Sequence, residues 1–221
     1  MSLTCQCPAA AAIPDVPNMG CAQSFGQIQK AAFIRLRGAS GALNSFAVSD
    51  GKTGQIEKLA SWEAKLSATD GTKMVVTPFL YSPADSGGDA RMTGGGNDDL
   101  GGIPDVLGAN PVQFAANMRS IPQKISKALK QLICEANAGN LGVFLFDENG
   151  AIEAIQDETT PTTYYPIPIR SLFVGDKLHG NYDAKDYNPI SWYYPENYSD
   201  NLTIVKPEFN PLTALVNAEN S

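Results

Sequence analysis

The sequence contains very little histidine and no long apolar run, and both shortages restrict what the protein can do. Among its 221 residues there is a single histidine, His179, in a polar segment. A nucleophilic triad needs a histidine placed as a base beside a serine or cysteine, and no G-x-S-x-G motif occurs. No apolar run approaches the length that crosses a bilayer, and Met1 to Cys5 lacks the basic and apolar regions of a signal peptide. We therefore expect neither a triad hydrolase, nor a membrane protein, nor an exported one.

Basic residues are scarce as well. The chain has 16 lysines and arginines against 23 aspartates and glutamates, a formal net charge of -7. A protein that holds nucleic acid through phosphate contacts needs a basic surface, so this balance argues against a nucleic-acid binder. It is compatible with a surface that DNA slides past without sticking, so DNA is expected only as passing cargo.

Cysteine is the third scarce residue, with four thiols at uneven spacing. A zinc site is one interpretation, formed by Cys5, Cys7 and Cys21 with Cys134 or His179. The spacing fits no common zinc module, and a single helical cysteine such as Cys134 is usually a small apolar core residue. Free thiols in a reducing cytoplasm are the favoured interpretation, so no metal and no cofactor are expected.

Glycine and proline, by contrast, are abundant. Twenty glycines and fifteen prolines lie mostly between apolar runs, which favours many short strands over a helical bundle. With 43% hydrophobic and 18% charged residues the chain is expected to fold. We predict a mainly β fold, a β-sandwich or small barrel with one packed helix at about 121–137, which is α+β by strict count. The predicted parts are an extended N-terminal arm (1–20), a single β-rich domain (21–215) and a polar tail (216–221).

The segment 110–155 has the clearest pattern. From Val112 to Arg119, apolar side chains occupy every second position, which predicts a half-buried strand. Ser120 stands where an N-cap belongs and Pro122 falls in the first turn of the helix that follows. Asn137 to Gly139 is a plausible helix stop, with glycine in the left-handed position.

The predicted helix has one apolar and one basic face. Lysines and a glutamine occupy the basic face, which is either an ordinary solvated face or a docking surface. The apolar face consists of Ile121, Ile125, Ala128, Leu129, Leu132, Ile133 and Ala136; the basic face consists of Lys124, Lys127, Lys130 and Gln131.

Shorter apolar runs predict the remaining elements. A second helical segment or two short turns are expected between Gln55 and Ala68. The predicted strands are 27–37, 43–48, 73–80, 141–146, 151–155, 162–174, 190–194 and 202–205, with a loop at 178–188 and a closing segment at 209–215.

The composition changes sharply between Ser82 and Asn110. Eight of these 29 residues are glycine and five are aspartate, against one basic residue, Arg91. No Gly-Lys-Ser/Thr or G-x-G-x-x-G pattern supports a phosphate loop, and the ligand spacing of an EF-hand is missing. We interpret the segment as a long flexible loop or splayed hairpin that becomes ordered on a partner subunit.

Opposite charges suggest where such a partner contact would form. The aspartates and glycines of this segment could meet the basic helix face of a neighbouring copy. The candidate assembly interface therefore comprises Asp85, Asp89, Gly94, Gly95, Gly96, Asp98, Asp99, Gly101 and Gly102 with Lys124, Lys127 and Lys130.

An aromatic cluster offers a different function. Trp192, Tyr193, Tyr194 and Tyr198 could line a glycan-binding face, although alternating aromatics in a strand are at least as often sheet packing. Paired carboxylates could support glycoside hydrolysis, but the sequence singles out no pair among its 23 acidic residues. We therefore expect no enzyme.

Six segments beyond residue 20 carry a resemblance to known proteins. They are CAQSFGQIQK from Cys21, SWEAKLSATDGTKMVVTPFL from Ser61, GGGNDDLGGIPDVLG from Gly94, YYPIPIRSLFVGDK from Tyr164, WYYPENYSDNL from Trp192 and the closing Phe209-Asn210-Pro211-Leu212. Together they resemble an uncharacterised group of proteins encoded by tailed phages and prophages of gut anaerobes. The expected architecture also looks like that of phage tail-tube proteins, a likeness at the level of fold.

The resemblance implies a virion structural protein made in the host bacterial cytoplasm. A tail-tube-like member would self-assemble into rings, hexameric in that family, and would contact other virion proteins. It would have a neutral-to-acidic lumen and long loops that reach the next ring. The alternatives are a carbohydrate-binding or adhesin-like module and, third, a hydrolase.

Overall fold

The computed structural model describes residues 24–48 and 54–217 of the chain. The chain divides into two compact units, one containing Gly88–Asn110 and the other containing Phe25–Gly87 and Pro111 onward. The arm at 1–20, with Cys5 and Cys7, lies outside the described residues, as do Cys21 and the last four residues of the chain. Strands account for 41% of the structure and helices for 17%, so the predicted mainly β class is confirmed.

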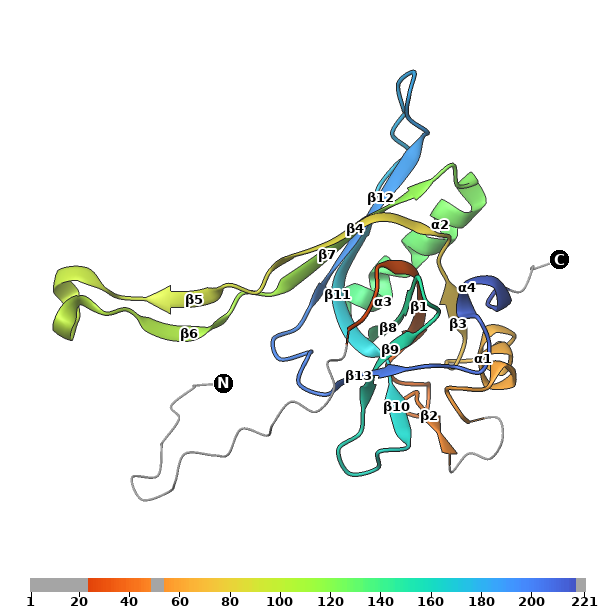
Figure 1. Ribbon diagram of the computed structural model, residues 1–221, viewed down its shortest axis with the longest axis horizontal. Helices are drawn as coiled ribbons and strands as arrows, with labels where there is room; N and C mark the ends of the chain where they lie inside the picture. Colours follow the sequence, from red (N-terminus) through yellow and green to blue (C-terminus); the bar gives the residue numbers. More distant parts are fainter. Residues whose placement is uncertain (1–23, 49–53, 218–221) are drawn as a thin grey trace. The chain divides into compact units, whose positions relative to one another are not determined.

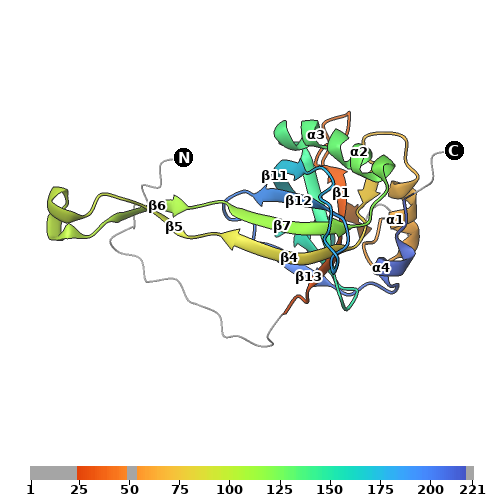
Figure 2. The ribbon, with the colours of Figure 1, turned by 90° about the horizontal axis from the view of Figure 1, so that it is seen from above.

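The larger unit is built from antiparallel strands in the order β2-β10-β9-β8-β11-β12-β7-β4 (Figures 1 and 2). Strand β1 pairs with β8 and β3, and β13 pairs with β9. The bounds are β1 Ile28–Arg35, β2 Phe46–Ala47, β3 Met74–Val76, β4 Leu80–Gly87, β7 Val112–Arg119, β8 Leu141–Asp147, β9 Ile152–Gln156, β10 Thr163–Tyr165, β11 Ile167–Val174, β12 Tyr187–Tyr194 and β13 Leu202–Val205.

Strand β11 changes partners along its length. Its first part, Ile167–Ile169, pairs with β8, whereas its second part pairs with β12. The change occurs at a bulge, where the register with β12 shifts between Arg170 and Phe173 and Ser171 has φ 52. A bulge bends a strand and increases its twist, so it allows one strand to turn from one sheet into another.

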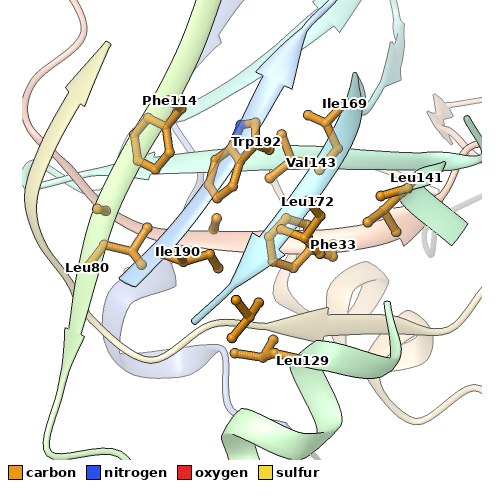
Figure 3. Close-up of a cluster of buried hydrophobic side chains, with 14 of the residues drawn as sticks. Phe33, Leu80, Phe114, Leu129, Leu141, Val143, Ile169, Leu172, Ile190 and Trp192 are labelled. Atoms are coloured by element: carbon orange, nitrogen blue, oxygen red, sulfur yellow. The ribbon is translucent and has the colours of Figure 1, made fainter. Parts of the chain in front are cut away.

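Two apolar cores lie on opposite faces of β1 and β8. The first core joins that layer to β4, β7, β11 and β12, and its members include Phe33, Phe114 and Trp192 (Figure 3). The second core lies between the other face of the layer and the helices α1 (Leu59–Leu66) and α4 (Pro211–Ala214), around Trp62. Because β8 is covered on both faces, all seven of its residues are buried.

The predicted helix exists, with a break near its middle. It consists of α2 (Gln123–Gln131) and α3 (Ile133–Asn137), joined at Leu132. The N-cap is Pro122 and not Ser120, because Ser120 has φ 52 and donates its backbone N–H to the Asp186 carbonyl at 2.9 Å. The predicted stop is confirmed, since Gly139 has φ 72 just after the last turn.

The helix packs on the first core through part of the predicted apolar face. Leu129 is 1% exposed and Ile121 is 5% exposed, as predicted, and Leu132 is half-buried against the same core. Ala128 is exposed, whereas Ser126 is buried in its place. Cys134 is exposed too, so its prediction as a core residue was wrong. The break at Leu132 interrupts the helical repeat for the residues that follow it, including Cys134.

Other boundaries differ where the backbone pairs without an apolar pattern. The segment 162–174 forms two strands with different partners, because Pro166 separates β10 from β11. Strand β12 starts three residues earlier than predicted, at Tyr187. Strand β4 extends to Gly87, inside the segment predicted as a loop or splayed hairpin. An edge strand can bond through its backbone while its side chains stay polar.

Candidate functional site

The smaller unit is a β-hairpin, which confirms the hairpin alternative for the glycine- and aspartate-rich segment. Strand β5 (Ala90–Thr93) pairs antiparallel with β6 (Asp105–Ala109), and short 3₁₀ turns, η2 (Gly96–Asp98) and η3 (Leu100–Gly102), lie between them. Gly94 has φ +75, and a Cβ placed there would lie 1.9 Å from the Asp99 Oδ2. That carboxylate accepts a hydrogen bond from the Gly95 N–H. The positive φ therefore favours glycine at Gly94, and a larger residue there would also displace the Asp99 carboxylate.

The hairpin exposes apolar and acidic side chains together. Residues 88–110 contain four aspartates and one arginine, a net charge of -3. Asp89 and Asp105 are exposed and Asp99 is half-buried, while the side chain of Asp98 is not among those described. Four large apolar side chains are also in solvent: Met92 is 53% exposed, Ile103 73%, Val106 59% and Leu107 48%. Within this hairpin the apolar side chains have no core to enter, which is the pattern of a contact surface.

In the larger unit, α2 carries the lysines that the sequence singled out. Lys124 and Lys127 are exposed, and Lys130 is half-buried. The Lys130 Nζ forms an ion pair with Asp176, which follows β11, and its hydrogen bond lowers the pKa of Asp176. The structure therefore links the basic helix face to the β11–β12 connection, which the sequence did not indicate.

A hollow of about 580 Å³ lies between α2 and that connection. Its lining contains three lysines, Lys127, Lys130 and Lys177, against one carboxylate, Asp176. Buried polar groups also line it, since Ser126 is 8% exposed and Asn188 is 3% exposed. The lining thus carries an excess of positive charge, which suits a carboxylate or another anion.

The connection 175–186 presents further exposed groups beyond the two residues that line the hollow. Tyr182 is fully exposed and Leu178 is 47% exposed. The backbone of Leu178 bonds to Tyr187, and the Gly180 N–H donates to the Asp186 carboxylate at 3.0 Å, so the base of the connection is braced. His179 is exposed, with its Nδ1 3.6 Å from the Asp186 carboxylate, so this histidine is a solvated loop residue.

The aromatic cluster does not form one exposed face. Trp192 is 0% and Tyr194 is 2% exposed, and both belong to the first core. Tyr193 is 37% exposed on the opposite face of β12. Tyr198 stacks on Tyr194, with ring centroids 4.4 Å apart and planes at 11°. The hypothesis of a glycan face that includes Trp192 is therefore wrong, and the alternative of sheet packing describes these residues.

A pair of acidic residues that the sequence did not single out as a pair lies at the edge of the first core. Burial raises the pKa of Glu153 from 4.5 to about 7, and the charges of Asp85 and Asp147 add to the effect. Partial desolvation also raises the pKa of Asp85, whose residue as a whole is exposed on β4. Asp147 has other partners, because its carboxylate accepts backbone N–H groups of Gly26, Asn149 and Ala151 at 2.7–3.0 Å.

The position of Glu153 could have been inferred from the strand period. Ile152 and Ala154, on either side of it, point into the second core, so Glu153 points toward the first. Its carboxyl can hold a proton near neutral pH. Within the residues that the structure describes, no group of three or more His, Cys, Asp or Glu side chains could hold a metal ion.

None of the helices in residues 24–48 and 54–217 is long and apolar enough to cross a membrane.

Comparisons with known proteins were made for sequence and structure. No family model matches the chain, and no curated protein matches it either. A chain in the tail of an empty gene transfer agent (GTA) particle with C6 symmetry is 10% identical, over 58% of this chain and 87% of that one, with a TM-score of 0.31.

Two further solved structures are similar to the same degree. A chain in the virion of a native GTA particle is 11% identical over 57% of this chain and 84% of that one, with a TM-score of 0.31. A chain in the six-fold symmetrised baseplate of the anti-feeding prophage is 7% identical over 86% and 100%, with a TM-score of 0.33.

Proposed function

We propose that this chain is a phage or prophage virion structural protein, tail-tube-like, that works by self-assembly into rings or tubes and contacts other virion proteins. The observation that carries the proposal is the hairpin 88–110, which keeps Met92, Ile103, Val106 and Leu107 in solvent. The sequence resemblance to phage and prophage proteins supports the same conclusion. On this proposal the protein is made in the host cytoplasm and resides in the virion.

The size of the apolar effect explains why the hairpin needs a partner. A two-stranded hairpin is marginally stable by itself in water. Full burial of one large apolar side chain contributes about 1.5–3 kcal/mol, so covering even two of the four would offset much of the cost of ordering the glycine-rich tip. A second copy of the chain, present at high local concentration in a ring, is the simplest source of such a cover.

The charge of the protein fits DNA as passing cargo. With a net charge of -7 the chain repels a phosphate backbone overall. A neutral or acidic lumen would let DNA move through without being held. The more specific proposal, that each ring contains six copies, rests on the family resemblance.

The experiment compares three forms of the full chain by sedimentation velocity, electron microscopy and thermal melting. The wild type is expected to form rings or tubes above a threshold concentration. Ile103→Ser/Val106→Ser is expected to melt like the wild type and to stay monomeric, because both side chains are exposed. Val48→Ser/Val216→Ser removes two exposed apolar side chains outside the hairpin, which are 46% and 68% exposed, and should still assemble.

The outcomes separate assembly from folding. A wild type that remains monomeric at every concentration, or a hairpin variant that assembles normally, contradicts the proposal. Deletion of Gly94–Gly102 gives a second measurement, with the fold expected to persist and assembly to be lost.

A further inference from the structure

We infer that the acidic hairpin of one copy docks into the hollow between α2 and the 175–186 connection of a second copy. This inference rests on the proposed function, because it assumes self-assembly, and it adds the receiving surface. The occupant is defined as residues 88–110, and the receiving groups are Lys127, Lys130 and Lys177.

Charge complementarity is the first argument. The hairpin has a net charge of -3, and two of its aspartates, Asp89 and Asp105, are exposed. The hollow offers three ammonium groups against the single carboxylate of Asp176. The chain as a whole has a net charge of -7 and repels a second acidic copy, whereas this lysine-rich hollow attracts one. Such complementary patches steer association and fix its register.

Apolar complementarity is the second argument. Carboxylates alone would not cover Met92, Ile103, Val106 and Leu107. Leu178, which follows Lys177 of the lining along the chain, is 47% exposed, so the receiving element also carries an exposed apolar side chain.

The existing ion pair does not block the hollow. Lys130 pairs with Asp176, whose side chain is 92% exposed. An exposed ion pair of this kind contributes little to stability, because water screens the two charges. A hairpin carboxylate can therefore replace Asp176 as the partner of Lys130 at small cost, and Lys127 and Lys177 add charge on either side.

The alternative occupant, a nucleic-acid phosphate, fits less well. Phosphate backbones need an extended basic surface, whereas this hollow contains Asp176 and borders a connection with Asp183 and Asp186. A duplex phosphate backbone also offers no apolar group that would cover the exposed Leu178. The test below therefore includes nucleic-acid binding as an alternative outcome.

The test uses reciprocal charge reversal in the full chain. Lys127→Glu/Lys177→Glu reverses the hollow, and Asp89→Lys/Asp105→Lys reverses the hairpin. Each variant alone is expected to raise the concentration needed for assembly at least about tenfold. An equimolar mixture of the two variants, or one chain that carries all four changes, is expected to restore assembly, because opposite charges meet again.

Controls distinguish the hollow from net charge and from folding. Lys73→Glu/Lys206→Glu changes the net charge equally at two exposed lysines outside the hollow and should assemble like the wild type. All variants are expected to keep the wild-type melting temperature, since the replaced side chains are exposed.

Three results would overturn the inference. The first is normal assembly of both reversed variants, which leaves the proposed function intact. The second is loss of assembly that the mixture does not restore or that the control shares. The third is a wild type that shifts DNA in a gel while Lys127→Glu/Lys177→Glu does not and still assembles. A wild type that never assembles contradicts the proposed function itself.

Discussion

The indole of Trp192 stacks on the phenyl ring of Phe114, with centroids 4.2 Å apart and planes at 22° (Figure 3). The two residues are direct partners across β7 and β12. Phe33 from β1 meets the same indole edge-on at 5.5 Å. Trp192 thus connects the β7–β12 sheet to the β1–β8 layer, which makes it a stability residue.

Replacing this tryptophan should destabilise the whole larger unit. Trp192→Ala is expected to lower the free energy of unfolding by about 3–5 kcal/mol, because it leaves a large cavity in the first core. Tyr193→Ala, at the neighbouring residue on the opposite face, should cost less than about 1 kcal/mol. Urea unfolding monitored by circular dichroism measures both. Equal losses would show that Trp192 and Tyr193 do not point to a buried and an exposed face of β12 as described.

Substitutions along the helix should destabilise the protein to different degrees. Leu129→Ala should cost about 2–5 kcal/mol, since Leu129 is 1% exposed. Leu132→Ala should cost less, because that side chain is half-buried at the break between α2 and α3. Lys127→Ala, on the exposed face, should change the free energy of unfolding by at most about 0.5 kcal/mol. Thermal melting of the three variants should reproduce this order. A larger loss for Leu132→Ala than for Leu129→Ala would show that Leu132 is more deeply packed than described.

Stability should depend on pH through Glu153. Its pKa is about 7 in the folded protein against 4.5 ordinarily, because of burial and the charges of Asp85 and Asp147. Folding therefore favours the protonated carboxyl, so its contribution is complete below about pH 4.5 and is lost as the pH rises through 7. The full shift corresponds to about 3 kcal/mol, which partial solvent screening reduces to about 1–2 kcal/mol.

Substitution of Glu153 isolates this effect. Glu153→Gln is expected to be more stable than the wild type near pH 8 and to lose this part of the pH dependence. Glu158→Gln, at an exposed glutamate, serves as the control and should keep it. Urea titrations from about pH 5 to about pH 8 give the comparison. An unchanged slope in Glu153→Gln would contradict the assignment.

Asn217 should protect the edge of β3. Its side-chain amide accepts the Val76 N–H and donates to the Val76 carbonyl, both at 2.7 Å, and so replaces a neighbouring strand. Asn217→Ala is expected to cost about 1–2 kcal/mol and to speed hydrogen exchange at the Val76 amide. The Val75 amide, which belongs to the β1–β3 ladder, is the internal reference. Unchanged exchange at Val76 would show that the contact contributes nothing in solution.

The sequence predicted those elements whose burial is one-sided. In β7 the alternation from Val112 to Arg119 matches a strand with Phe114, Ala116 and Met118 buried. In β1 the alternation fails, because Ala31, Ala32, Phe33 and Ile34 are all buried between two cores. A strand covered on both faces loses its period of two, so its facing could not be assigned from the pattern.

The candidate site was predicted only in part for a different reason. The Lys124–Lys130 face and the acidic hairpin each have a local signature in composition. The contribution of Asp176 and Lys177 to the hollow depends on a contact between the β11–β12 connection and α2. Four strands, β8 to β11, lie between these two elements along the chain. Glu153 and Asp85 likewise approach through tertiary structure alone.

The position of β1 between two cores also has a consequence during synthesis. Its residues 28–35 pair with 141–147, so the strand waits for more than a hundred later residues before its main partner exists. At about 5–20 residues per second, β1 spends roughly 6–22 s after leaving the ribosome with an apolar, unpaired backbone edge. This segment therefore exposes apolar surface that chaperones can bind during synthesis, before β8 is available to cover it.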